Sequence, residues 1–243
     1  MPFALEGKNA LVTGASRGIG RAIAERLAAD GAAVAINYAR NEQSARELVN
    51  RIVKNNGFAV AIQADVAKPV EVRKLFENAE KALGRLDIVV ANAGVYISKP
   101  LLESSEADYD YIFDINSRGV FFTLQEAARR LRDGGRIIVV STGGTKMHFP
   151  NHSLYVGSKG AVEQFARSLA IELGPRKITV NVLSPGFTET DMLPEEYRDH
   201  GASLSPFNRI GSPQEVADVS AFLASEAARW VTGQIIQAGG GVV

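Results

Sequence analysis

The chain has 243 residues, and its 27 Lys and Arg residues balance 27 Asp and Glu residues, so the formal net charge is zero, which argues against a nucleic-acid partner. The apolar fraction of 46% supports a sizeable hydrophobic core, and the lack of cysteine excludes disulfides and thiol chemistry and suits a reducing cytoplasm. No apolar stretch has the length of a signal peptide or a membrane span, so we expect a cytoplasmic protein without a membrane partner.

Short apolar runs alternate with longer amphipathic segments along the whole chain. We expect strands at residues 9–12, 33–38, 59–63, 88–91, 136–141, 178–183 and 235–237. We expect helices at residues 18–30, 44–55, 70–83, 109–131, 155–173 and 213–225. This alternation predicts an α/β fold with one doubly wound parallel sheet of about seven strands and helices on both faces. No linker-like stretch interrupts the pattern, so we expect residues 1–243 to form a single domain.

The longest segment without an expected strand runs from residue 184 to residue 212. Prolines and glycines recur in it, among them Pro194, Gly201 and Pro206. Long irregular insertions in compact domains commonly form lids or binding loops, and ligands of doubly wound sheets bind beyond the carboxyl ends of the strands. We therefore expect a substrate-covering loop near residues 187–211.

The first expected strand runs into a glycine-rich turn that opens directly into the first helix. Its glycines are Gly14, Gly18 and Gly20, with Ser16 and Ile19 between them. Glycines in such a turn let the backbone approach a pyrophosphate and leave helix amides to bind it. The turn lacks the Lys and Ser or Thr that end the phosphate-binding loop of an NTPase. The context predicts a Rossmann-type dinucleotide site, and the alternative is a turn that needs glycine only for its tightness.

The end of the second strand indicates which dinucleotide binds. A site for NAD carries an Asp or Glu there that binds the ribose, but this chain has Tyr38, Ala39 and Arg40. Together with Arg17 in the glycine turn, Arg40 offers two guanidinium groups, which bind a 2′-phosphate through charge-assisted hydrogen bonds. The sequence therefore favours NADP(H) as the cofactor. The alternative is that Arg40 is an ordinary surface arginine.

Tyr155 and Lys159 stand four residues apart in an expected helix, so their side chains share one face. A neighbouring cation lowers the pKa of a phenol from its usual value near 10 by about 1–3 units, which favours proton donation near neutral pH. The hydroxyl of Ser141, at the end of the preceding strand, is placed to donate to the same developing oxyanion. Taken without the glycine turn, the pair is better explained as a core tyrosine and a surface lysine.

These features together resemble the short-chain dehydrogenase/reductase family over essentially the whole chain, in particular its 3-oxoacyl-(acyl-carrier-protein) reductases and polyketide naphthol reductases. The resemblance implies that Tyr155 donates the proton, that Lys159 holds the nicotinamide ribose and lowers the pKa of Tyr155, and that Ser141 positions the carbonyl. It implies that Asn116 anchors a water of a proton relay. Besides the glycine turn, Tyr155 and Lys159, the cofactor positions that it implies are Asp65 with Val66 near the adenine, Asn92, Ala93 and Gly94 below the cofactor, and Pro185, Gly186, Thr188 and Thr190 beside the nicotinamide carboxamide.

Two positions depart from the family pattern. Ser141 lies 14 residues before Tyr155, whereas many members carry the hydroxyl 13 residues before the tyrosine, where this chain has Thr142. Either hydroxyl fits, and we favour Ser141 because the stretch 150–161 resembles naphthol reductases, in which the longer spacing also occurs. Ala238 replaces the Asp that precedes the C-terminal Gly-Gly of the family, so any contact made by that Asp is in doubt.

The sequence thus predicts reversible hydride transfer between NADPH and a ketone. Apolar residues flank the matched site and favour a flat aromatic ketone or a 3-oxoacyl thioester, including one held on an acyl carrier. These residues are Met147, Phe149, Phe187, Met192, Leu193 and Tyr197. One alternative is an NAD(P)-dependent dehydrogenase of a polyol, sugar or secondary alcohol. The other is an NADP(H)-binding sensor or scaffold without turnover.

Metal binding and assembly are less strongly marked. His148 and His152 lie four residues apart, but Pro150 between them and the absence of matching ligands argue against a metal site, so we expect none. The resemblance implies a homo-oligomer, with a tetramer favoured, that pairs the helices expected at 109–131 and 155–173.

Overall fold

The computed structural model describes residues 5–243. Within them, seven parallel strands form one sheet in the order β3-β2-β1-β4-β5-β6-β7. The strands are β1 (Asn9–Val12), β2 (Ala33–Tyr38), β3 (Phe58–Gln63), β4 (Ile88–Ala91), β5 (Arg136–Val140), β6 (Thr179–Pro185) and β7 (Ile235–Ala238). The strand order reverses between β1 and β4, which confirms the doubly wound sheet. In such sheets the ligand binds beyond the carboxyl ends of the strands at this reversal.

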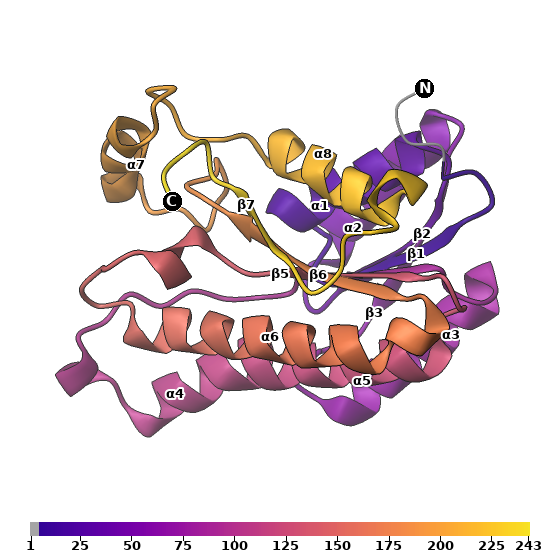
Figure 1. Ribbon diagram of the computed structural model, residues 1–243, viewed down its shortest axis with the longest axis horizontal. Helices are drawn as coiled ribbons and strands as arrows, with labels where there is room; N and C mark the ends of the chain where they lie inside the picture. The colour runs from indigo at the N-terminus through magenta and orange to yellow at the C-terminus, as the bar shows by residue number, and fades with distance from the viewer. Residues whose placement is uncertain (1–4) are drawn as a thin grey trace.

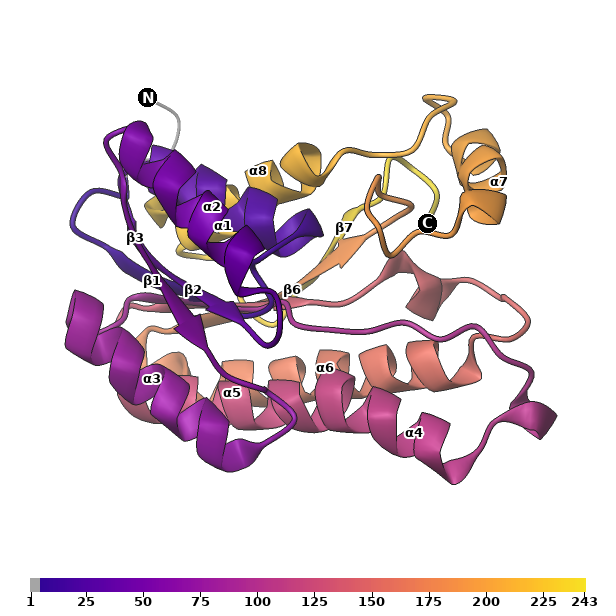
Figure 2. The same ribbon diagram turned by 180° about the vertical axis from the view of Figure 1, so that it is seen from behind.

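Helices cover both faces of the sheet (Figure 1, Figure 2). One face carries α1 (Gly18–Ala29), α2 (Glu42–Lys54) and α8 (Pro213–Ala224), and the other carries α3 (Pro69–Leu83), α4 (Glu106–Phe113), α5 (Val120–Arg130) and α6 (Ser153–Glu172). The short helix α7 (Arg198–Leu204) lies apart from both layers, near the C-terminus of the chain (Figure 1). None of the helices between residues 5 and 243 combines the length and the hydropathy that a membrane span requires.

Successive strand residues enter two hydrophobic cores, one on each face of the sheet. Val12 and Ile36 pack in the core with α1 and α8, whereas their neighbours Leu11 and Ala35 pack in the core with α3, α5 and α6. All 4 residues of β4 are buried, because helices cover both of its faces. This double burial explains why the strands appear in the sequence as continuous apolar runs.

The single helix expected at residues 109–131 is wrong. The helical segment begins after Ser105, whose side chain forms a capping box with Asp108, and a π-helical turn at Asp114–Gly119 separates α4 from α5. The turn carries Asn116, which is fully buried. Turns of this type occur often at functional sites, where they redirect a side chain. The sequence did not reveal the turn, because the amphipathic pattern continues on both sides of it.

The segment expected to cover the substrate, residues 187–211, contains α7 and is closed at its base. The Gly211 amide donates to the Phe187 carbonyl oxygen, and the Glu189 amide donates to the Gly211 carbonyl oxygen, both at 2.8 Å. The ring of Phe187 lies against α7 at Gly201, where a Cβ would come within 2.4 Å of the ring. Because β6 ends at Pro185, this closed segment starts at the carboxyl end of the sheet.

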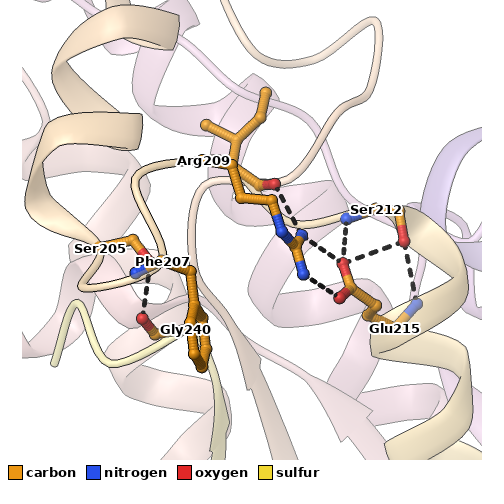
Figure 3. A network of polar contacts seen from close by, with 7 residues as sticks. Ser205, Phe207, Arg209, Ser212, Glu215 and Gly240 are labelled. Carbon is orange, nitrogen blue, oxygen red and sulfur yellow. Dashed lines mark hydrogen bonds and ion pairs between the residues drawn. The ribbon is translucent and has the colours of Figure 1, made fainter.

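Further contacts hold the C-terminal end of the segment 187–211, near Ser205 and Arg209 (Figure 3). The Ser205 hydroxyl donates to the Gly240 carbonyl oxygen at 2.7 Å, and the Arg209 guanidinium pairs with both carboxylate oxygens of Glu215. Glu215 also forms a capping box with Ser212 at the start of α8. The Arg209 hydrogen bond and the amide of Ser212 lower the pKa of Glu215 to about 2. The segment is thereby joined to α8 and to the C-terminal loop.

Candidate active site

The glycine turn lies against the loop after β4, where the backbone leaves no room for side chains. A Cβ on Gly14 would lie 2.8 Å from the Cα of Ala93, and a Cβ on Gly20 would lie 2.4 Å from the side-chain nitrogen of Asn92. That nitrogen donates to the carbonyl oxygens of Thr13 at 2.9 Å and Gly14 at 3.1 Å. No side chain caps the N-terminus of α1, so its backbone amides can receive an anion.

The two arginines expected to bind a phosphate are both exposed. Arg17 has 66% of its side chain exposed, and its guanidinium lies 3.7 Å from the Asp191 carboxylate, which belongs to the segment 187–211. Arg40 follows the end of β2 and is also exposed. Exposed pairs of this kind contribute little to stability, so both guanidinium groups can turn to a ligand. Tyr38 differs, because it is only 6% exposed and packs in the core, so a side-chain contact with a cofactor falls to its neighbours.

Asp65 and Val66 shape the turn after β3. The Asp65 carboxylate accepts a hydrogen bond from the Ala67 amide at 3.0 Å and lies 3.8 Å from the Lys68 ammonium. Val66 is buried, and its carbonyl oxygen would lie 2.9 Å from a Cβ on Gly119. Their contacts with an adenine stay a prediction.

Gly94 lies between the side chains of Asn116 and Lys159. A Cβ on Gly94 would come within 3.2 Å of the Lys159 ammonium and 3.3 Å of the Asn116 Oδ1 atom. Asn116 accepts from the Val95 amide at 2.8 Å, and its own amide donates to the Val95 carbonyl oxygen at 2.9 Å and to Ser158 at 3.1 Å. Asn116 therefore joins the loop after β4 to α6, and its part in a water relay stays a prediction.

Burial shapes the proton affinities of the expected catalytic pair. The Lys159 ammonium donates to the Val140 carbonyl oxygen at 2.9 Å, and burial lowers its pKa to about 8 against the opposing charge of Glu163. Burial raises the pKa of Tyr155, against a hydrogen bond with Thr142. The expected lowering of the Tyr155 pKa by Lys159 is therefore wrong for the chain alone, because desolvation of the phenol dominates. A raised pKa keeps the proton on the phenol at neutral pH.

The structure gives the two candidate hydroxyls different partners. Ser141 is buried, and its hydroxyl donates to the Glu163 carboxylate at 2.8 Å. The Thr142 hydroxyl accepts from the Gly144 amide at 3.2 Å, and its effect on the pKa of Tyr155 opposes that of burial. Both residues line the same pocket. The spacing in the sequence left this choice open, and the hydrogen bonds distinguish the two side chains.

One pocket brings part of the expected site together, and its lining residues do not include Asn116 or Lys159. It encloses about 900 Å³ of space that is partly open to solvent. Its polar and cofactor-side lining includes Ile19, Ser141, Thr142, Tyr155, Pro185, Gly186, Thr188 and Thr190. The apolar residues expected to form a wall all line it, namely Met147, Phe149, Phe187, Met192, Leu193 and Tyr197. The glycine turn lies close by, because a Cβ on Gly18 would be 3.5 Å from the Thr190 methyl group.

Sequence reasoning missed Tyr96 and His152, which also line this pocket. The Tyr96 hydroxyl lies 2.6 Å from Nε2 of His152, whose Nδ1 lies 2.5 Å from the Pro150 carbonyl oxygen. Since a carbonyl only accepts, Nδ1 carries the proton and Nε2 accepts from Tyr96. The Tyr96 ring stands edge-on to that of Tyr155, with centroids 5.1 Å apart. A signal was present, because His152 precedes Tyr155 by one helical turn, but its spacing from His148 had suggested only a metal ligand.

Comparison with known proteins now decides the family. A family model described as enoyl-(acyl carrier protein) reductase matches residues 14–243. The chain belongs to the short-chain dehydrogenase/reductase family. Membership in this family makes the protein an oxidoreductase and confirms the resemblance drawn from the glycine turn and from Tyr155 and Lys159.

Similar short-chain dehydrogenases/reductases include proteins named for aromatic substrates. The hydroxynaphthalene reductase-like protein of Metarhizium brunneum is 46% identical, over 100% of this chain and 97% of that protein. Versicolorin reductase of Emericella nidulans is 45% identical, over 98% of this chain and 97% of that protein.

Solved structures of the family superpose closely on this chain. A short-chain dehydrogenase from Burkholderia cenocepacia in complex with NADP is 41% identical, with a TM-score of 0.95 over 98% of this chain and 99% of that one. The angucycline C-6 ketoreductase LanV with bound NADP is 42% identical, with a TM-score of 0.94 over 99% of this chain and 97% of that one. These superpositions confirm the Rossmann-type fold expected from the sequence.

Proposed function

We propose that this short-chain dehydrogenase/reductase is an NADPH-dependent ketone reductase that acts on aromatic, polyketide-type ketones. The observation that carries the proposal is that the Tyr155 phenol shares one pocket with Ile19 and Pro185 of the expected cofactor side. Carbonyl reduction needs a hydride donor on one side of the carbonyl and a proton donor on the other. The presence of a protonated phenol at that place favours turnover over a sensor or scaffold role.

The residues of the chain fit an NADP cofactor. The glycine turn has no side chain that would block a pyrophosphate at the N-terminus of α1. Arg17 and Arg40 supply positive charge where a site for NAD carries a carboxylate. Residues 185–190 would hold the nicotinamide end, and Lys159 would hold its ribose. When bound, NADPH supplies the hydride. The NADP in the Burkholderia and LanV structures supports this choice.

Tyr155 delivers the proton to the carbonyl oxygen in this proposal. Thr142 opposes the rise in the pKa of the phenol that burial causes, and so favours the phenolate left behind. Lys159 and Asn116, which flank Gly94, would return a proton from solvent to Tyr155. The part of Ser141 depends on where its own proton points.

The shape of the pocket supports a flat aromatic substrate. Phe149 and Phe187 stand edge-on at a centroid distance of 6.0 Å, and Tyr197 stands edge-on to His152 at 5.7 Å. Aromatic rings stack against such walls in offset or edge-on geometry. The hydroxynaphthalene reductase-like and versicolorin reductase relatives support the same substrate class. Residues 187–211 would cover the bound ketone.

A substrate panel at saturating NADPH tests this function. We expect the highest kcat/KM with a hydroxylated tetralone, a lower value with a 3-oxoacyl thioester, free or on an acyl carrier protein, and no turnover of a sugar or polyol. A higher kcat/KM with the thioester would identify the protein as a 3-oxoacyl thioester reductase. A higher kcat/KM for oxidation of the polyol with NADP⁺ would identify it as a polyol dehydrogenase. Tight NADPH binding without turnover of any member would support the sensor or scaffold alternative.

We also propose that the protein is a cytoplasmic homotetramer whose main contact is between α5 and α6 of two copies. These helices expose Phe121, which is 43% exposed, and Ile171, which is 81% exposed. Exposed apolar side chains on adjacent helices commonly mark an interface. The lack of cysteine suits the reducing cytoplasm. Light scattering after gel filtration tests the assembly, and a monomeric mass would contradict it.

A further inference from the structure

Glu163 is a buried acid that the proposed proton transfer leaves without a role. It lies on α6, one helical turn after Lys159 and two after Tyr155, and it is 5% exposed. Its Oε1 atom accepts hydrogen bonds from the hydroxyls of Ser141 and Thr145, each at 2.8 Å. A buried carboxylate persists only where hydrogen bonds or a cation offset its desolvation. Two hydroxyl donors and the nearby Lys159 ammonium, whose pKa Glu163 raises, meet that need here.

The bond from Ser141 to Glu163 decides what Ser141 offers to the pocket. A hydroxyl has one proton, and a carboxylate can only accept. With its proton directed to Glu163, Ser141 turns lone pairs toward the pocket that it lines. Ser141 therefore cannot donate to a ketone oxygen while this bond holds. Hydrogen bonds to a charged acceptor are about twice as strong as neutral ones, so a ketone oxygen competes poorly for this proton.

We propose that Glu163 is a positioning residue that acts through Ser141 and sets it as a hydrogen-bond acceptor in the pocket. Tyr155 is then the donor to the ketone oxygen, and Ser141 accepts the O–H of the product alcohol or of a substrate hydroxyl beside the ketone. The proposal rests on the proposed function, because it assigns a part in ketone reduction. Its consequence is that loss of Glu163 slows turnover and leaves NADPH binding unchanged.

A double-mutant cycle of Ser141→Ala and Glu163→Gln tests the proposal. The readouts are kcat for a hydroxylated tetralone at saturating NADPH, and the NADPH Kd by fluorescence titration. We expect each single change to lower kcat about tenfold and the double change to lower it no further, because Ser141→Ala removes the bond and Glu163→Gln takes away the charge that holds the Ser141 proton in it. The Kd should stay within about twofold. A kcat about a hundredfold lower in the double variant would show two independent effects and would overturn the proposal. An unchanged kcat in Glu163→Gln would overturn it as well.

Two matched variants separate this route from general damage to α6. Glu172 lies on the same helix, is exposed and accepts from the Ser168 hydroxyl at 3.2 Å, so Glu172→Gln should leave kcat within about twofold of the parent. Thr145→Val removes the other donor to Glu163 and should also leave kcat within about twofold. If Thr145→Val slows turnover as much as Glu163→Gln does, the carboxylate acts through the turn at Gly143–Lys146, and the Ser141 route is wrong.

The activity of the unmodified enzyme distinguishes a failure of this proposal from a failure of the proposed function. If it reduces no ketone, the proposed function fails, and the same cycle measured on the midpoint of urea unfolding tests the bond by itself. If the two single changes do not add up to the change in midpoint of the double variant, the bond between Ser141 and Glu163 is supported. If they do add up, the proposal is overturned. If Glu163→Gln does not fold, Glu163→Asp keeps the charge and withdraws it from Ser141. That variant should also lose about tenfold in kcat, and an unchanged kcat would refute the proposal.

Discussion

The ammonium of Lys159 lies 2.9 Å from the carbonyl oxygen of Val140, so α6 is hydrogen-bonded to the last residue of β5. This bond places Lys159 beside the residue that follows the strand, Ser141. Burial without a full counter-charge lowers the Lys159 pKa to about 8, although Glu163 opposes the shift. The helix therefore carries a side chain that weakens the fold, as the proposed catalytic role of Lys159 would explain.

Tyr155→Phe removes the proposed proton donor and keeps the ring. We expect kcat for ketone reduction to fall by about 10²- to 10⁴-fold, because that is the usual contribution of a positioned general acid. The NADPH Kd should change by less than about twofold, since the ring that lines the pocket remains. The exposed Tyr111 provides the control, as Tyr111→Phe removes a phenol outside the pocket. Retention of most of the parent rate would remove Tyr155 from the mechanism.

Lys159→Met should stabilise the ligand-free protein. The pKa of the ammonium is about 8 in the folded chain against the usual 10.5, so the unfolded chain binds more protons between these values. The destabilisation is complete below pH 8 and fades as the pH rises to 10.5. After allowance for the lost bond to Val140, we expect a gain of about 1–2 kcal/mol in the free energy of unfolding at pH 7.

Urea unfolding at pH 7 and pH 10 measures this effect. The gain from Lys159→Met should shrink between the two pH values, because the parent lysine loses its charge. Lys81 is exposed on α3, and Lys81→Met should change the free energy of unfolding by less than about 0.5 kcal/mol. A loss of stability at pH 7 in Lys159→Met would show that the hydrogen bond outweighs the desolvation of the ammonium.

Arg17→Ala and Arg40→Ala should reduce the preference for NADPH. Each guanidinium is expected to bind the 2′-phosphate, so each change should raise the KM for NADPH about tenfold and leave the KM for NADH nearly unchanged. Arg46 serves as the control, because it is exposed on α2 and paired with Glu42 at 2.6 Å. Higher efficiency with NADH in the parent enzyme would contradict the arginine argument before any variant is made.

Ser212→Ala removes the N-terminal cap of α8. The Ser212 hydroxyl accepts from the Glu215 amide at 3.3 Å, and loss of such a cap costs about 1 kcal/mol. The free energy of unfolding from urea titration should fall by that amount. Ser168 donates to Glu172 on the surface of α6, so Ser168→Ala should have little effect. Equal stability of Ser212→Ala and the parent would mean that the cap contributes nothing beyond the Arg209 and Glu215 pair at the start of α8.

The fold was predictable from the sequence because the signals for it are local. A buried parallel strand such as β4 is an uninterrupted apolar run, and glycines mark the turn before α1. The positions of Tyr155 and Lys159 on one face of a helix also follow from spacing alone. The break between α4 and α5 was not predictable, since a π turn changes the hydrogen-bond ladder without changing the apolar pattern. Tyr96 and His152 were missed for a related reason, because they meet across residues far apart in the chain.

The sequence by itself determined the alternation of strands and helices, the dinucleotide turn and the pairing of a phenol with an amine, because each depends on neighbours within a few residues. Only the tertiary structure decided how protons are distributed among these groups. Burial raises the pKa of Tyr155 and lowers that of Lys159, and Glu163 accepts a hydrogen bond from the Ser141 hydroxyl. Desolvation and hydrogen-bond direction depend on the groups that surround a side chain in space, and residue order does not contain that information.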